Sequence, residues 1–291
     1  MMKLSFITDE ATQSFSEAVS FAKAHGLSGL ELRSVEDMPI DQIPADTLRD
    51  WKHTLDENGL KVCSLAGSFY KCAPDAPELL DGELQKLRRL CDAADILDCR
   101  IIRGFAFFAP DSGALPAKTL APLFREPMEL IERRGKLLAL EADPSVNTTN
   151  HASLAALLEA IHHPCAMAIY DPGNDIYDPL MEIPYPDGYE AIKPYICHIH
   201  IKDAVRTAAG PECVNIGTGL VDYPLLLQHL LRDGYDGWLS LETHYRKNAH
   251  LTEEQMRLPQ GGAFSAGGFE ATAESAASLR RLLEEAKKDC C

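Results

Sequence analysis

Short apolar runs rich in β-branched residues alternate with longer amphipathic runs along the whole chain. Short runs of this composition, bounded by polar or glycine residues, are typical of β-strands. Eight of them predict strands at Leu4–Thr8, Leu30–Arg33, Lys61–Leu65, Arg100–Phe105, Leu137–Glu141, Cys165–Asp171, the first part of Tyr195–Arg206, and Trp238–Thr243.

The amphipathic runs predict helices, because their apolar residues recur three or four positions apart. Gly26, Gly59 and Gly135 each follow such a run, as is typical of a helix C-terminus. The predicted helices are Phe15–His25, Pro44–Asn58, Pro77–Leu97, Pro116–Arg134, Ser153–Ile161, Tyr223–Arg232 and Phe269–Lys287. The Pro-, Tyr- and Asp-rich segment Pro172–Lys193 has room for at most a short helix.

This alternation predicts parallel strands joined by right-handed crossovers. Eight strand–helix units in 291 residues match a (β/α)8 TIM barrel, and we expect one domain over residues 1–291 because no linker interrupts the pattern. The rival fold, a doubly wound sheet, needs a glycine-rich phosphate loop after its first strand. Here that turn reads TDEATQS, without glycine, so the sequence favours the barrel.

Metal-binding side chains stand at the ends of four successive predicted strands. Glu141 ends the fifth strand, Asp171 the sixth, His200 the seventh and Glu242 the eighth. The carboxyl ends of barrel strands meet at one rim, which carries the active site. Each acid alone would serve equally well in a salt bridge or a helix N-cap. Together, three carboxylates and one imidazole favour Mn²⁺, Mg²⁺ or Co²⁺, with positions left open for a substrate.

The stretch YICHIHIKDAVR carries two imidazoles and two cations. Alternation along a strand places His198 and His200 on one face. We interpret His198 as a buried hydrogen-bonding residue on the substrate side of the site, and His200 as the ligand. Lys202 and Asp203 follow where the strand gives way to a polar loop; each is either an acid–base or substrate-contacting group or part of a simple ion pair.

Two arginines also end predicted strands at the acidic rim. Arg33 follows the second strand and Arg103 ends the fourth. They either neutralise the acids or hold a carboxylate or phosphate of the substrate.

Charge and composition exclude several other classes of protein. The formal net charge is −16 without a cluster of Lys or Arg, which argues against nucleic acid and anionic membranes as partners. No apolar run approaches the roughly 20 residues of a membrane span, and the N-terminal residues do not resemble a signal peptide. The nine cysteines form no CxxC pair, so we expect free thiols and a cytoplasmic protein.

Three motifs resemble the xylose isomerase-like TIM barrels, the sugar phosphate isomerase/epimerase superfamily. They are HIHIKD, DPGN after the sixth strand, and NIGTGLVDYPLLLQHLLRDGYDGWLSLE. This superfamily includes ketose 3-epimerases, inosose dehydratase and endonuclease IV. The resemblance spans nearly the whole chain and is strongest from Glu141 to Glu242.

The resemblance implies that Glu141, Asp171, His200 and Glu242 bind one divalent ion, which would be Mn²⁺, Mg²⁺, Co²⁺ or Zn²⁺. It also implies that Arg206, six residues after the metal-binding imidazole, contacts the substrate.

The chain departs from the epimerases at two positions. Asn174 stands where they have a histidine, three residues after the sixth-strand Asp, and is assigned to the substrate site. Asn147 stands where they have a second Glu. Endonuclease IV needs more histidine ligands than this sequence offers at its third and fourth strand ends.

These features predict a metal-dependent isomerase or epimerase of a small polyhydroxylated carbonyl compound. Glu141 and Glu242 are the candidate proton carriers, and Arg206, Lys202, Arg103, Asn174 and His198 the candidate substrate-binding residues. The alternative is a dehydratase acting on an inosose or a dehydroshikimate-type substrate. A non-catalytic sugar-binding barrel and a nuclease are weaker alternatives, and homo-oligomer formation is left open.

Overall fold

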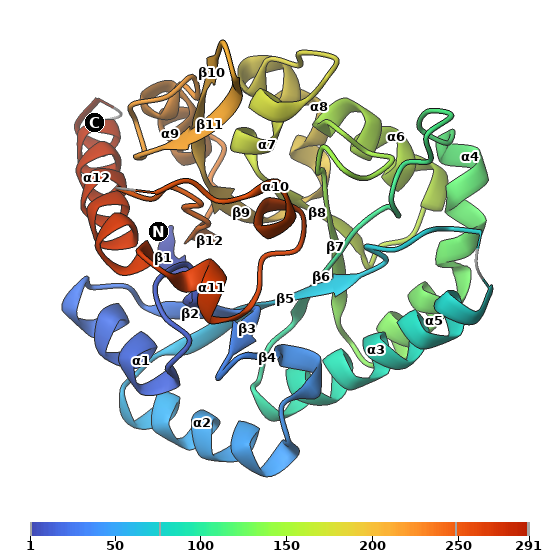
Figure 1. Cartoon of the computed structure of the whole chain (residues 1–291), viewed down its shortest axis with the longest axis horizontal. Helices are drawn as coiled ribbons and strands as arrows, with labels where there is room; N and C mark the ends of the chain where they lie inside the picture. Colours follow the sequence, from blue (N-terminus) through green and yellow to red (C-terminus); the bar gives the residue numbers. More distant parts are fainter. Residues whose placement is uncertain (1, 76, 248, 290–291) are drawn as a thin grey trace.

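The computed structural model places eight parallel strands in a ring that is surrounded by helices (Figure 1). It describes residues 2–75, 77–247 and 249–289. The strands are β1 (Lys3–Phe6), β2 (Gly29–Leu32), β5 (Lys61–Phe69), β6 (Ile101–Gly104), β7 (Leu137–Glu141), β8 (Ala166–Tyr170), β9 (Ile196–Ile201) and β12 (Trp238–Leu241).

The ring follows the order β1-β12-β9-β8-β7-β6-β5-β2, and each neighbouring pair in it is parallel. A parallel bridge between Ile7 and Glu31 links its two end strands. The prediction of a (β/α)8 TIM barrel is therefore confirmed.

Helices on the outside of the ring connect successive strands (Figure 1). They are α1 (Phe15–Ala24), α2 (Ala45–Glu57), α3 (Pro77–Ile96), α4 (Ala117–Leu120), α5 (Arg125–Arg133), α6 (His151–Ile161), α7 (Pro172–Tyr177), α8 (Tyr189–Ile192), α9 (Tyr223–Arg232) and α12 (Gly268–Asp289). Strands such as β7 (LLALE) and β8 (AMAIY) are almost uniformly apolar because the helices cover one face and the barrel interior covers the other.

The segment Pro172–Lys193, predicted to hold at most a short helix, carries α7, a π-helical turn over Pro184–Gly188, and α8. Two further predicted elements differ from the structure. The predicted helix Pro116–Arg134 is broken by a 3-10 turn over Ala121–Phe124, where Pro122 has no N–H to continue an α-helix. The predicted strand Lys61–Leu65 extends to Phe69, with a register irregularity between Leu65 and Phe69. Both differences arise from local backbone features that periodicity alone does not reveal.

Additional elements cover the carboxyl end of the barrel. They are the hairpins β3 (Ser34–Val35) with β4 (Met38–Pro39) and β10 (Asp203–Thr207) with β11 (Gly210–Val214), and the helices α10 (Glu253–Arg257) and α11 (Gly261–Ser265). In Figure 1, α10 and α11 lie in front of the ring of strands. The hairpin β10–β11 occupies most of the region that the sequence predicts as a polar loop.

Within the described residues, no helix has the length and apolar character needed to cross a membrane. The cysteines described there are free thiols, as expected from their spacing. Cys290 and Cys291 lie outside the described residues.

Candidate metal centre and active site

The four predicted metal ligands converge at the carboxyl end of the barrel. Glu141, Asp171, His200 and Glu242 each offer a donor atom, and these atoms all lie within 4.8 Å of one another. All four side chains are buried. Asp171 follows β8 directly and caps α7, because its Oδ1 accepts a hydrogen bond from the backbone N–H of Gly173 at 2.9 Å. The positions at the strand ends, together with this cap, determine the directions in which the four candidate ligand side chains point.

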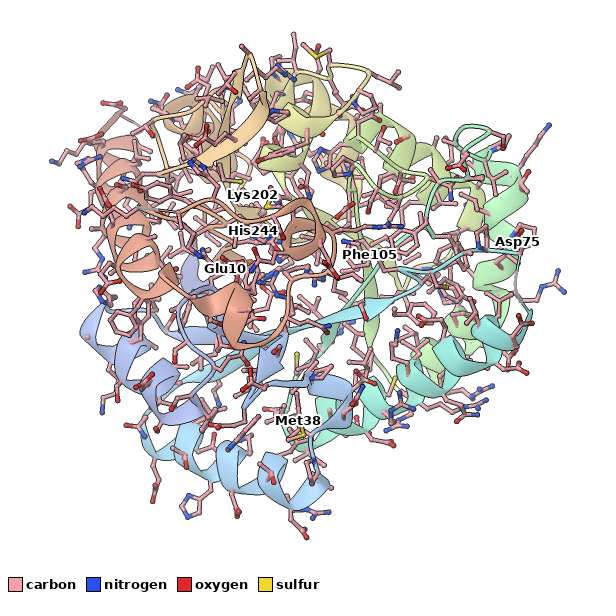
Figure 2. All side chains as sticks on the ribbon, in the orientation of Figure 1. Glu10, Met38, Asp75, Phe105, Lys202 and His244 are labelled. Atoms are coloured by element: carbon pink, nitrogen blue, oxygen red, sulfur yellow. The ribbon has the colours of Figure 1, made fainter. Side chains whose placement is uncertain are left out.

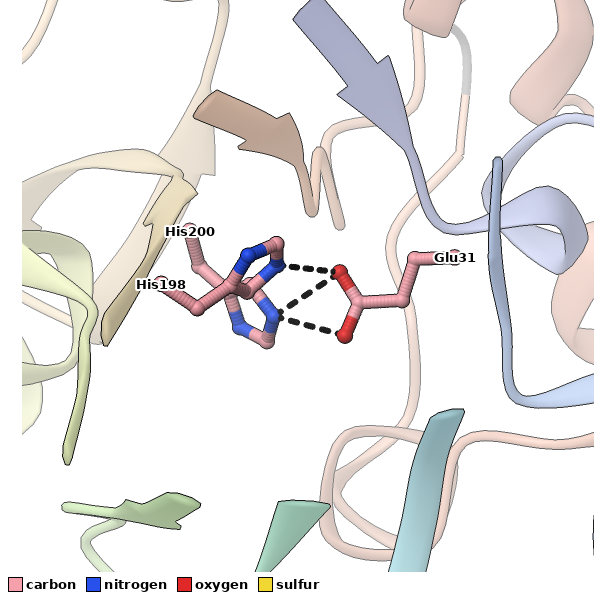
Figure 3. A group of neighbouring side chains, drawn as sticks. All are labelled: Glu31, His198 and His200. Carbon is pink, nitrogen blue, oxygen red and sulfur yellow. Dashed lines mark hydrogen bonds and ion pairs between the residues drawn. The ribbon is translucent and has the colours of Figure 1, made fainter. Parts of the chain in front are cut away.

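Glu31 on β2 orients the imidazole of the candidate ligand His200 (Figure 3). His200 Nε2 lies 3.2 Å from both carboxylate oxygens of Glu31, and His198 Nε2 lies 2.8 Å from Oε2. A carboxylate that accepts the Nε2–H of His200 leaves the Nδ1 lone pair free. That Nδ1 faces Glu141 Oε1 at 2.9 Å and Glu242 Oε2 at 3.3 Å, which is the side on which a cation would sit.

Three cations hold the carboxylates in place. Arg33 Nη1 lies 2.8 Å from Glu242 Oε1, and Arg103 Nη1 lies 3.0 Å from Glu141 Oε2. Lys202 Nζ lies 3.1 Å from Glu242 Oε2 and is also close to Asp171. Three of the four candidate ligands are therefore restrained by cations, which is the arrangement expected of a preorganised site.

The bulge in β5 explains how Arg103 keeps its orientation. Its Nε and Nη2 donate to the backbone carbonyls of Gly67 and Ala66, at 3.2 and 3.0 Å. These residues lie in the irregular part of the strand, where carbonyls are released from the regular ladder. Nη1 is then directed toward Glu141.

With every carboxylate ionised and every imidazole neutral, which is the state that binds a metal, the buried ion-pair network is short of two positive charges. Six carboxylates (Asp9, Glu10, Glu31, Glu141, Asp171 and Glu242) face four cations that are permanently charged at neutral pH (Arg33, Arg103, Lys202 and Arg246). Buried charge without compensation is costly. Either one divalent cation or two protonated imidazoles would balance the network.

The protonation of the ligands follows from these contacts. Burial raises the pKa of Asp171 to about 7, against the opposing effect of the Lys202 ammonium. Burial alone would lower the pKa of His200, but the carboxylates around it, led by Glu31, raise it well above its ordinary value. For Glu242, burial is outweighed by Lys202 and His200, which hold its pKa well below the usual range.

These residues fit one divalent ion. An oxygen-rich donor set with a single oriented imidazole suits Mg²⁺, Mn²⁺, Co²⁺ or Zn²⁺. The charge deficit of the network equals the charge of such an ion. Glu141, Asp171, His200 and Glu242 would hold it, with Glu31 behind His200.

A cavity of about 910 Å³ opens beside this centre. Of the predicted substrate-binding residues, Lys202, Arg103 and Asn174 line it. The Asn174 amide donates to the carbonyl of Ala142 at 2.8 Å, beside Glu141. His198 is fully buried behind the ligand layer, against Glu31.

Arg206 lies on the exposed side of β10. Its Nε and Nη2 donate to the backbone carbonyls of Ile176 and Asp175, at 3.1 and 3.2 Å, and it is absent from the cavity lining. Direct contact between Arg206 and a substrate therefore stays a prediction.

Two polar residues singled out in the sequence hold loops instead of lining the cavity. The Asp203 carboxylate accepts hydrogen bonds from the backbone N–H groups of Gly217, Gly219 and Val221. The Asn147 side chain donates to the carbonyls of residues 106–108. Neither side chain lines the cavity.

A second layer of the site comes from the turn after β1. Asp9 and Glu10 both bind Arg33, and Glu10 Oε1 also lies 2.8 Å from His244 Nδ1. In Figure 2, Glu10, Lys202 and His244 lie toward the centre of the barrel, whereas Asp75 lies at the periphery. In the sequence these two acids stand in the turn TDEATQS, and no role was predicted for them. Their position directly after the first strand is the signal that places them at the rim.

Replacement of Glu31 by Gln is expected to weaken metal binding about 10- to 100-fold, the usual effect of losing such a supporting carboxylate. The reason is that an amide no longer enforces the Nε2–H form of His200. Calorimetric titration with Mn²⁺ measures the affinity. Glu83→Gln is a matched control, because Glu83 is also buried but binds Tyr70 and Lys86 away from the centre. Equal affinity of Glu31→Gln and the native protein would contradict this role.

Comparison with known proteins gives one family and a large set of similar folds. The family model described as xylose isomerase-like TIM barrel matches residues 19–288. No curated protein sequence matches the chain.

Three solved structures illustrate the similarity. L-ribulose 3-epimerase superimposes with a TM-score of 0.74 and 15% identity, covering 99% of this chain and 97% of its own. The probable 3-DHS dehydratase AsbF from Bacillus anthracis gives 0.69 and 21%, covering 91% and 97%. The IOLI protein, whose structure contains a zinc atom, gives 0.73 and 15%, covering 98% and 99%. At these identities the likeness establishes the fold and not the reaction.

Proposed function

This chain belongs to the xylose isomerase-like TIM barrel family, and we propose that it is a divalent-metal-dependent isomerase or epimerase of a sugar-like carbonyl compound. The observation that carries the proposal is the pairing of Glu141 and Glu242. Both carboxylates face Nδ1 of His200, at 2.9 and 3.3 Å, from strands on either side of β9 and β8 in the ring. Two acids within reach of one substrate carbon can remove a proton from it and return one to it, which is the pair of transfers that epimerisation requires.

The protein's own groups supply the proton transfers. A divalent ion, when bound, supplies Lewis acidity to a substrate carbonyl and so acidifies the neighbouring C–H bond. Glu242 is ionised, because Lys202 and His200 hold its pKa well below the usual range, and is therefore available to accept that proton. The electron pair of the C–H bond passes to the carbonyl oxygen and gives an enediolate. The proton for the opposite face comes from solvent in the open cavity. Glu141 starts ionised, because His200 and Arg103 outweigh burial and lower its pKa; it takes up that proton and passes it to the carbon, and Glu242 later releases the one it removed.

The surrounding cations stabilise negative charge and fix geometry. Lys202 Nζ lies 3.1 Å from Glu242 and reaches the same cavity, so it can donate to the enediolate oxygen. Arg33 and Arg103 hold Glu242 and Glu141 by direct ion pairs. These contacts restrict the carboxylates to orientations from which proton transfer is possible.

The second candidate function, a dehydratase, is favoured by the same lysine. Elimination of water begins with the same removal of a proton, but the β-hydroxyl then needs a proton from an acid as it leaves. Lys202 is a buried ammonium at the cavity wall, next to Glu242, and could provide it.

Incubation of metal-reconstituted protein with ketoses and inososes in deuterated water separates these functions. An epimerase incorporates deuterium at the carbon beside the carbonyl and forms a stereoisomer without a new chromophore. A dehydratase forms a conjugated product that absorbs in the ultraviolet. Binding without any exchange of the C–H proton would contradict both functions and favour a non-catalytic sugar-binding barrel.

A further inference from the structure

A buried imidazole–carboxylate pair lies behind the candidate ligand Asp171. His151 is the first residue of α6, Asp175 lies in α7, and both side chains are fully buried. His151 Nδ1 lies 2.8 and 2.7 Å from the two carboxylate oxygens of Asp175. Neither residue lines the cavity, so a substrate in the cavity does not reach them.

The other ring nitrogen of His151 contacts the backbone of the candidate ligand. Nε2 accepts a hydrogen bond from the backbone N–H of Asp171, at 3.3 Å. A neutral imidazole accepts at Nε2 only when its proton is on Nδ1. Because Asp175 accepts the Nδ1–H, it selects the tautomer of His151 that can hold the Asp171 backbone.

The same residues could instead be a second metal site, because His151, Asp175 and Glu182 form a group of suitable donors. Their donor atoms are already in use, however. The two carboxylate oxygens of Glu182 accept from the backbone N–H groups of His151 and Ala152, at 2.8 and 3.1 Å. The proton between His151 Nδ1 and Asp175 occupies the position that a metal ion would need. These contacts favour a supporting role.

The helix α7 has little freedom to move without disturbing the metal centre. Its cap is Asp171, and its second residue, Gly173, lies against Lys202. A Cβ at Gly173 would lie 2.6 Å from the Lys202 carbonyl oxygen and 2.8 Å from the Lys202 Cβ. His151 contacts both the cap and, through Asp175, the middle of this short helix. It is therefore placed to fix the start of α7 relative to the barrel.

We propose that His151 and Asp175 are positioning residues of the metal centre. Asp175 fixes the tautomer of His151, and His151 holds the backbone of Asp171 so that its carboxylate is directed toward the ion. This inference rests on the proposed function for the presence of a divalent ion, and it adds two residues that touch neither ion nor substrate. It makes no assumption about the reaction.

The test is calorimetric titration of His151→Phe and His151→Gln with Mn²⁺, without substrate. Phe keeps a ring of similar size but cannot accept the Asp171 N–H. It should weaken Mn²⁺ binding about tenfold, the lower end of the usual loss when a supporting partner of a metal ligand is removed. Gln places an amide oxygen near the position of Nε2 and should retain most of the native affinity.

His163→Phe is the matched control. His163 Nδ1 accepts a hydrogen bond from the backbone N–H of Cys165 at 3.2 Å, which is the same kind of contact at the opposite end of β8. Removal of this contact should leave Mn²⁺ affinity unchanged, because Cys165 is not a candidate ligand.

The tautomer provides a second test that does not depend on His151→Phe folding. Ring nitrogen chemical shifts of the metal-free protein should place the His151 proton on Nδ1. In Asp175→Asn, Mn²⁺ affinity should follow the proton: it falls if the amide moves the proton to Nε2, and it stays native if the proton remains on Nδ1. A proton on Nε2 in the native protein, or affinity that does not follow the tautomer, would overturn the inference.

Three further results would also overturn it. They are native Mn²⁺ affinity in His151→Phe, even with a lower melting temperature; an equal loss in His163→Phe; and two ions bound by the native protein but one by His151→Phe, which would make the group itself a metal site. Deuterium exchange tests the proposed function separately. Weaker Mn²⁺ binding in His151→Phe, with no exchange catalysed by the native protein, would uphold the positioning role and reject the proposed reaction.

Discussion

The variant Glu242→Gln is expected to lose at least about a hundredfold in turnover, the lower range for removal of a general base. Gln preserves the shape of the side chain but cannot accept a proton at neutral pH. Exchange of the substrate C–H proton with deuterated water should fall by the same factor, because the proposed base acts in that step. Nuclear magnetic resonance measures the exchange, and a coupled or chromatographic assay measures turnover.

Metal content must be measured in the same samples, because Glu242 is also a proposed ligand. Loss of turnover at saturating Mn²⁺, with one equivalent bound, would identify the proton-carrying role apart from the ligand role. Glu83→Gln controls for the general effect of neutralising a buried carboxylate. If Glu242→Gln with bound metal retains normal exchange, the base is another group, and Glu141 is the next residue to replace.

The fold was predictable because the barrel repeats one simple pattern. Apolar strands such as β7, buried on both faces, alternate with amphipathic helices, and both patterns are visible without alignment. The break in the predicted helix Pro116–Arg134 and the bulge in β5 were not predictable. They depend on where Pro122 falls in a helix and on backbone carbonyls that bind Arg103, and neither affects hydrophobic periodicity.

The candidate ligands were predictable for a related reason. In a barrel, the carboxyl ends of all strands meet at one rim, so residues at the ends of predicted strands can be placed there from sequence alone. This is how Glu141, Asp171, His200 and Glu242 were predicted to lie together. The partners behind them could not be predicted, since the contact between Glu31 and His200 joins residues that lie 169 positions apart. Residues 249–260 also form part of the cavity wall, and the helix α10 within them was not predicted, because the segment carries no helical periodicity.

Metal binding is expected to release protons and to weaken steeply as pH falls. In the metal-free protein the pKa of Asp171 is raised to about 7, with burial as the main cause. The pKa of His200 is raised well above its ordinary value, because the carboxylates of Glu31, Glu141 and Glu242 outweigh the effect of burial. Below these pKa values both groups carry protons, and both must lose them to act as ligands.

The direction of the pH dependence of metal affinity, and the pH range in which it is steep, follow from Asp171 and His200. Below about pH 7, each unit of acidification should lower the affinity up to roughly a hundredfold, tenfold for each of two protons. Above that pH, Asp171 is already ionised. The change in metal affinity should then fall to roughly tenfold per pH unit, because only His200 still has to lose a proton. The charge deficit of the buried network also predicts two displaced protons, because one divalent ion carries the charge of two protons.

Calorimetric titration of metal-free protein with Mn²⁺ from pH 6 to 9, in buffers of different ionisation enthalpy, measures the protons released. We expect close to two protons near pH 6 and close to one near pH 8. Asp171→Asn should bind more weakly and release one proton fewer near pH 6, whereas His53→Gln, at an exposed histidine, should change nothing. Affinity independent of pH, with no proton release, would show that the ion binds elsewhere, because any site that includes His200 must displace its proton.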